Sequence, residues 1–253
     1  MDKQQDQSFN SILFCGCSHV YGTDLEDYYR HINGMEPIDN YWNVGEHQSS
    51  HRYSRLLANR YGAMEYNISE PGGSNDHIAA KVVEFVNKNF SPDLAIIQLT
   101  YPTRFLAYDD YHRTWQNVMP SHMGYLPKEL NEAKDLFYKY VYHDRMAVMH
   151  YWRNAYLLQE MFRAKGIEYF FFRTSHVPHL KDDLYYPYID QTRFFKQSMQ
   201  EDLSKGLHET FCVPKVKGVT VGCHLNEMGH RKVYKYILNS IEHFYTHGFQ
   251  RLS

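Results

Sequence analysis

A serine, a histidine and a glycine turn lie in three separate polar segments and could together carry out nucleophilic catalysis. Ser18 follows Gly16 and Cys17, and His224 lies in the segment 222–226. A serine hydroxyl becomes a nucleophile when an imidazole within hydrogen-bond reach takes its proton, and histidine titrates near neutral pH. Each residue also has a simpler interpretation, because serine often begins a helix and a loop histidine can be an ordinary surface residue.

The glycine pair in the segment PGGSND at 71–76 could supply a backbone N–H to a developing negative charge. A backbone donor must approach its acceptor closely, and the missing side chain of Gly72 permits that approach. Gly-Gly is also a standard turn signal, and the two roles are compatible.

Short apolar runs alternate with segments of helical spacing, and several runs end at these polar segments. The predicted strands span residues 11–15, 63–68, 94–99 and 167–172, and the predicted helices span 50–61, 76–89, 144–165 and 226–247. This alternation predicts a parallel α/β sheet, in which ligands bind at the carboxyl ends of the strands. Segments 16–19, 71–76 and 100–104 are therefore expected to meet there.

Three stretches lack the alternation. Residues 101–142 and 174–218 are rich in aromatic residues or proline, and we expect irregular insertions there; 24–46 is expected to be a long loop. The predicted fold class is α/β, a three-layer α/β/α sandwich with a four- or five-stranded parallel sheet. A single domain over 1–253 is expected, because this length supports one large core.

Three blocks resemble those of the SGNH (GDSL-like) hydrolases and follow the family's order. FCGCSHVYG resembles the nucleophile block, with Ser18 in the serine position and Cys17 where the family usually has Asp. NISEPGGSND resembles the second block, in which a glycine N–H contributes to the oxyanion hole, and Gly72 is the best match. GCHLNEMGH resembles the final block, DxxHPNxxGH, which supplies the histidine base, here His224.

The resemblance implies a serine esterase that hydrolyses a small acyl ester, with an O-acetyl group on a carbohydrate or similar polar molecule as the expected substrate. Ser18 would be the nucleophile and His224 the base. The N–H groups of Ser18 and Gly72 would hold the oxyanion, with Asn75 or Thr100 as the side-chain donor.

Further residues are expected to line the substrate groove, namely His19, Asp24 and Arg104. For most such loop residues, ordinary packing is the competing interpretation.

Two positions depart from the family's pattern. The acid three residues before the histidine is replaced by Val221, and the block after the third strand lacks the family's oxyanion asparagine. The Nδ1–H of His224 is therefore expected to be accepted by a backbone carbonyl in 219–223 or by an acid from elsewhere in the chain. We favour the carbonyl, which gives a Ser–His dyad; a distant acid would give a rewired triad. Glu227 is expected to act structurally at a helix start. The alternative is an SGNH-fold binding or structural protein with weak or no catalysis.

Composition excludes several other classes of function. The 27 basic and 29 acidic side chains leave a net charge of -2, which provides no bulk field for nucleic acid or an anionic membrane. No apolar run approaches the roughly 18–20 residues of a membrane span, and the N-terminus lacks the apolar region of a signal peptide. Four cysteines without a CxxC pair favour a cytoplasmic location. The divergent blocks are similar to those of SGNH-like proteins encoded by bacteria and their phages.

Neither a metal nor another cofactor is expected. His19, His224 and His230 could be imagined around zinc, but the sequence has no HExxH and no Cys/His ligand spacing. It also has no GxGxxG for a dinucleotide. His230 is expected to pack or cap within the closing helix.

Overall fold

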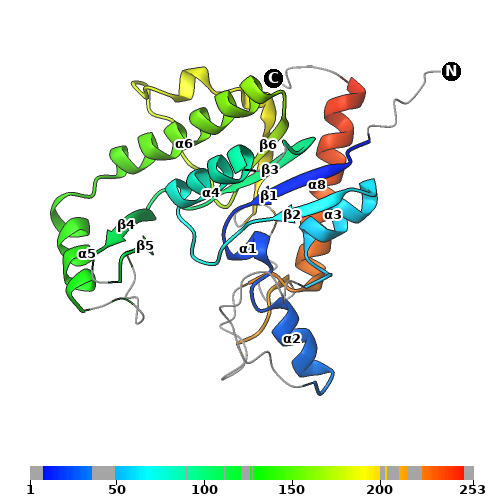
Figure 1. The fold of residues 1–253 in the computed structure, drawn as a ribbon, viewed down its shortest axis with the longest axis horizontal. Coiled ribbons are helices and arrows are strands. Elements are labelled where there is room, and N and C mark those ends of the chain that lie inside the picture. The colour runs from blue at the N-terminus through cyan, green and yellow to red at the C-terminus, as the bar shows by residue number, and fades with distance from the viewer. Residues whose placement is uncertain are drawn as a thin grey trace.

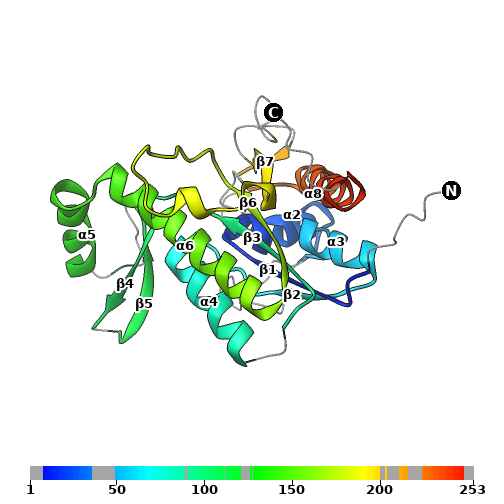
Figure 2. The same ribbon diagram turned by 90° about the horizontal axis from the view of Figure 1, so that it is seen from above.

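The computed structural model describes residues 8–35, 49–88, 91–110, 112–120, 126, 128–199, 203, 211–215 and 224–247. Within them, a five-stranded parallel sheet lies between two layers of helices (Figures 1 and 2). The strand order is β2 (Met64–Asn67), β1 (Ser11–Cys15), β3 (Leu94–Leu99), β6 (Glu168–Arg173) and β7 (Phe194–Ser198). Numbered among themselves these strands run 2-1-3-4-5, the order of flavodoxin-like doubly wound sheets. The predicted fold class is confirmed.

Side chains of β1 alternate between the two helical layers. Leu13 and Cys15 pack with helices α4 (Asn75–Lys88) and α6 (Asp144–Lys165). Ile12 and Phe14 pack on the opposite face with α3 (Tyr53–Tyr61) and α8 (Glu227–His247). Successive strand residues point to opposite faces, so a strand covered on both sides is a continuous apolar run. The run 11–15 is buried along its whole length for this reason.

Helix α6 is the longest described helix, and both of its ends are capped. The His143 side chain accepts a hydrogen bond from Arg145 N at 3.1 Å, and Gly166 ends the helix in the left-handed conformation at φ 66°. These caps satisfy backbone groups that a helix end leaves unpaired. None of the helices in the described ranges is long and apolar enough to cross a bilayer.

The stretches predicted to be irregular contain regular structure, so that expectation is wrong in part. Residues 101–142 hold the antiparallel hairpin of β4 (Phe105–Asp109) and β5 (Thr114–Val118), followed by α5 (Lys128–Tyr140). These elements lie at one end of the molecule, beyond the main sheet (Figures 1 and 2). The expected loop after Asp24 begins with α2 (Leu25–Ile32), which buries only Leu25.

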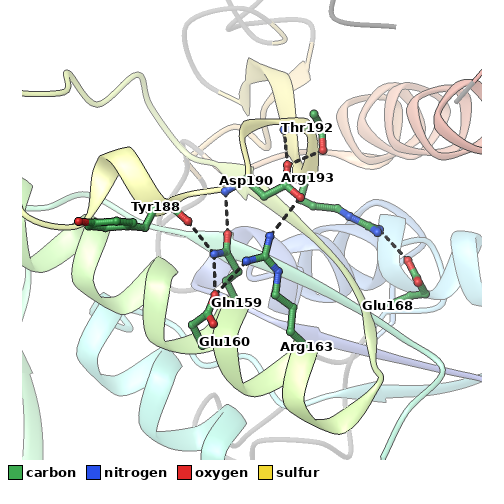
Figure 3. A network of polar contacts seen from close by, with 8 residues as sticks. All are labelled: Gln159, Glu160, Arg163, Glu168, Tyr188, Asp190, Thr192 and Arg193. Atoms are coloured by element: carbon green, nitrogen blue, oxygen red, sulfur yellow. Dashed lines mark hydrogen bonds and ion pairs between the residues drawn. The ribbon is translucent and has the colours of Figure 1, made fainter. Parts of the chain in front are cut away.

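The stretch 174–218 contains two short 3-10 turns, η1 (Tyr186–Tyr188) and η2 (Gln191–Arg193), and the fifth strand, β7. Gln159 of α6 fastens this stretch to the sandwich (Figure 3). Its side chain donates to Tyr188 O at 2.9 Å and accepts from Asp190 N at 2.8 Å. The Gln159 side chain is fully buried, and these two contacts hold the segment against α6.

Candidate active site

Ser18 lies at the carboxyl end of β1, on a sharp turn from strand to helix. It is the first residue of α1 (Ser18–Tyr21), a single turn that ends when Gly22 adopts φ 85°. The turn leaves no room for a side chain at position 16, where an added Cβ would lie 2.4 Å from Val20 Cγ2 and 2.8 Å from Gln98 Cβ. This close packing presents Ser18 beside the ends of the neighbouring strands.

His224 is held by a carboxylate from the loop that follows α1. Its Nδ1 lies 2.8 Å from Asp24 Oδ2, across 200 residues of sequence. The Asp24 side chain is fully buried, whereas that of His224 is 18% exposed. A neutral imidazole that donates Nδ1–H to a carboxylate keeps Nε2 unprotonated, and Nε2 is then available as a base.

This contact overturns two expectations from the sequence. The predicted backbone-carbonyl partner for His224 is wrong, because Asp24 occupies Nδ1; the segment 219–223 itself lies outside the described residues. Asp24 was also expected to line a substrate groove, yet its side chain has no exposed surface. The single turn of α1 and the bend at Gly22 carry Asp24 back beneath the histidine.

His19 packs against His224. The ring centroids are 5.4 Å apart in an edge-on arrangement, so the segments of Ser18 and His224 lie side by side. His19 is buried and its Nδ1 has no partner within the described residues. Burial lowers the pKa of His19 well below its usual value, and the adjacent His224 lowers it further. His19 therefore stays neutral and does not repel a positive charge that forms on His224.

The glycine turn lies against the Ser18 segment. The N–H of Gly73 donates to Glu70 O at 3.2 Å, and a Cβ on Gly73 would lie 3.6 Å from Gly16 O. Gly72 has φ 77°, and no described residue accepts a hydrogen bond from its N–H. Of the two glycines, Gly72 is thus the one whose N–H has no acceptor in the described part of the chain.

Asn75 and Thr100 are bound to each other and are both buried. Asn75 Oδ1 accepts from Thr100 N at 2.8 Å, and its Nδ2 donates to Thr100 O at 3.2 Å. This pair ties the start of α4 to the end of β3. It leaves one N–H of the Asn75 amide for another acceptor.

Arg104 joins the glycine turn at Gly73 to Thr100 at the end of β3. Its Nη1 donates to Thr100 Oγ1 at 3.2 Å and to Gly73 O at 3.4 Å, and its guanidinium lies over the Tyr101 ring at 5.2 Å. The carboxyl ends of β1, β2 and β3 therefore meet as the strand pattern predicts.

His230 has a structural place, as expected from the sequence. Its Nδ1 accepts from Tyr53 N at 3.2 Å, at the first residue of α3, and the two rings stack at 5.7 Å. Burial lowers the pKa of His230 to about 3. Within the described residues, no group of three His, Cys, Asp or Glu side chains could hold a metal ion.

The contact of Asp24 with His224 is the site feature that sequence reasoning missed. One signal was present, because Asp24 is the first acid after Ser18 in the chain.

Ser18 Oγ forms no hydrogen bond with any described residue. Catalytic hydrogen bonds are often long in ligand-free structures.

No protein-family model matches the chain, and neither does any curated protein. Across nearly its whole length the chain is similar in structure to several solved esterases. One is the esterase EstA from Pseudoalteromonas sp., at 13% identity and a TM-score of 0.46, covering 93% of this chain and 98% of that one. Another is an acetylxylan esterase from Geobacillus stearothermophilus, at 15% identity and a TM-score of 0.46, covering 96% of each chain. A third is an acetyl xylan esterase from the rumen bacterium Butyrivibrio proteoclasticus, at 10% identity and a TM-score of 0.46, covering 93% of this chain and 64% of that one.

Proposed function

We propose that this protein is a serine esterase whose catalytic residues are Ser18, His224 and Asp24. The contact of 2.8 Å between His224 Nδ1 and the buried carboxylate of Asp24 is the observation that carries the proposal. A carboxylate in this position fixes the tautomer and ring orientation of a histidine base and stabilises the imidazolium that forms during reaction. The triad replaces the dyad suggested by Val221.

In the first half of the reaction, Ser18 Oγ attacks the ester carbonyl and its proton passes to His224 Nε2. The resulting oxyanion is held by the N–H groups of Ser18 and Gly72, with the remaining Asn75 N–H as the expected side-chain donor. The imidazolium then gives its proton to the departing alcohol, and an acyl group remains on Ser18.

In the second half, His224 takes a proton from water, and the hydroxide attacks the acyl carbonyl. Collapse of this second intermediate breaks the bond to Ser18 Oγ, which recovers its proton from His224. The products are the free acid and the alcohol. His19, neutral and packed against His224, adds no charge that would oppose the imidazolium.

The proposed substrate is a small acyl ester, such as an acetyl ester, on a carbohydrate or similar polar molecule. The resemblance of the three sequence blocks to SGNH hydrolases supports this class. The sequence contains 23 Tyr and 16 His, which combine flat faces with polar edges, as sugar recognition requires.

Turnover of p-nitrophenyl acetate tests the proposal. Ser18→Ala is expected to reduce the rate on the order of 10⁴-fold, to the background of the assay, because the nucleophile is lost. Ser240→Ala, which removes a hydroxyl that donates to Tyr236 O on α8, is the matched control and should retain the wild-type rate.

A binding protein that has kept the fold without catalysis is the second candidate. The observation in its favour is that Ser18 Oγ forms no hydrogen bond with His224 in the described structure. Equal rates for the wild type and Ser18→Ala, with several p-nitrophenyl esters of different acyl length, would support it and reject the esterase.

A further inference from the structure

A cavity of about 290 Å³ lies next to the candidate active site. It is bounded by the start of α4, the segment that leads into β4, helix α5 and the first half of α6. Its volume is close to the lower end of the roughly 300–1,000 Å³ of ligand pockets, which is suited to one ring-sized group.

Two residues of the cavity wall also hold the loops of the active site. Asn75 binds the backbone of Thr100, and Arg104 binds Thr100 Oγ1 and Gly73 O. A molecule in the cavity would therefore touch the same side chains that fix the glycine turn beside Ser18. The cavity therefore shares two wall residues with the loops of the candidate active site.

The charged groups of the cavity wall do not cancel. Asp76 is 2.9 Å from Arg153 Nη2 and 3.0 Å from Asn154 Nδ2, so its charge is already matched. Burial and the nearby Arg153 lower the pKa of His150, which keeps that ring neutral at physiological pH. Arg104 forms no ion pair with a carboxylate in the described part of the chain, so the wall carries a net positive charge.

The guanidinium of Arg104 also has unused donors. Its hydrogen bonds to Gly73 and Thr100 both come from Nη1, which leaves the edge formed by Nε and Nη2 without a protein partner among the described residues. That edge presents two parallel N–H groups, the geometry that binds a carboxylate through both oxygens.

We propose that this cavity binds a carboxylate-bearing ring of the substrate, with Arg104 as the residue that selects it. The ester that Ser18 hydrolyses would then be carried by an acidic saccharide, such as one that contains a uronic acid. The inference rests on the proposed esterase function and specifies its substrate class. Phe105, Phe137 and Tyr151 form an apolar part of the wall, against which the flat face of a sugar ring can pack.

Binding of two non-hydrolysable probes tests the proposal without any need for turnover. Methyl glucuronide carries the carboxylate, and methyl glucoside is its neutral counterpart; both are titrated into the wild type by calorimetry. We expect the glucuronide to bind at least tenfold more tightly. Equal binding, no binding of either probe, or tighter binding of inorganic phosphate than of the glucuronide would overturn the assignment.

Two variants at Met146 test whether the glucuronide binds in this cavity. Met146 lines the wall from α6 and does not take part in the contacts of Arg104 with Gly73 and Thr100. Met146→Glu adds a negative charge and is expected to weaken glucuronide binding at least tenfold, whereas the neutral Met146→Gln should keep it. Equal glucuronide binding by these two variants would contradict the cavity as the binding site.

Failure of the cavity proposal and failure of the proposed esterase function give different experimental results. Preferential binding of glucuronide by the wild type, lost in Met146→Glu, would support the cavity even if Ser18→Ala had no effect on ester turnover. Conversely, Ser18-dependent turnover with no preference for glucuronide would overturn the cavity assignment and leave the esterase standing.

Discussion

At Asp24 the backbone has φ 66°, in the left-handed region, which Asp and Asn adopt more often than other residues with a side chain. This conformation places the carboxylate under His224, in the buried interior. The backbone conformation and the burial of Asp24 together hold its carboxylate against the histidine.

Replacing this carboxylate tests its role at the residue scale. Asp24→Asn keeps the size and the tolerance of the left-handed conformation but removes the charge. We expect kcat for p-nitrophenyl acetate to fall by about 10²–10⁴, because the amide favours the wrong tautomer and cannot stabilise the imidazolium. Glu26→Gln, on the neighbouring helix α2, is the control and should retain activity. A wild-type rate in Asp24→Asn would remove Asp24 from the mechanism.

Ser18 and His224 could be named as candidates from the sequence because each lies in a short block with recognisable neighbours. Asp24 could not be identified as the acid, because it contacts a histidine 200 residues away and only the folded chain brings the two together. The family's position for the acid holds Val221, which directed the prediction towards a backbone carbonyl.

At the scale of elements, the site depends on how the ends of neighbouring strands are tied together. Asn75 joins the start of α4 to the end of β3 through both backbone groups of Thr100. Its truncation would leave these buried groups without partners. We expect Asn75→Ala to lower the free energy of unfolding by about 1–3 kcal/mol, as measured by urea denaturation.

Asn33→Ala is the control for this measurement. Asn33 is exposed at the end of α2, where its amide donates to Tyr29 O, so the loss should be clearly smaller. An equal loss in both variants would show that the Asn75–Thr100 link has no special importance for stability.

The strands β1 and β3 were predicted with their observed bounds because helices cover both of their faces and their sequences are continuously apolar. Helix α2 was missed because it buries only Leu25 and so has no apolar stripe to identify it. The β4–β5 hairpin was missed because its strand sequences, FLAYD and TWQNV, do not alternate strictly between apolar and polar residues. Tertiary contacts, more than local sequence, define these elements.

At the scale of the whole molecule, buried histidines make stability depend on pH. His230 of α8 caps α3 and has a pKa of about 3, below the ordinary value of about 6.5. Between these values the unfolded chain binds a proton that the folded chain does not. Stability therefore rises with pH through this window and is lost as the pH falls from about 6.5 towards 3.

Thermal or urea unfolding between pH 7 and 4.5 checks this expectation. The wild type should lose stability on acidification, by up to about 1.4 kcal/mol per pH unit for this one group. His230→Gln should flatten the dependence, with a residual slope from His19, whose pKa burial also lowers. His31→Gln, at an exposed position of α2, should leave the slope unchanged. A slope that His230→Gln does not alter would mean that this histidine is protonated in the folded protein.

The most direct test of the central claim is covalent labelling with a fluorophosphonate, followed by peptide mass spectrometry. The probe reacts with a serine whose hydroxyl is activated by a neighbouring base. We expect one adduct, on the peptide that contains Ser18, with labelling abolished in Ser18→Ala and strongly slowed in His224→Gln. Absence of an adduct on Ser18 in the wild type, or an adduct on another serine that persists in Ser18→Ala, would contradict the assignment of this site as a serine esterase.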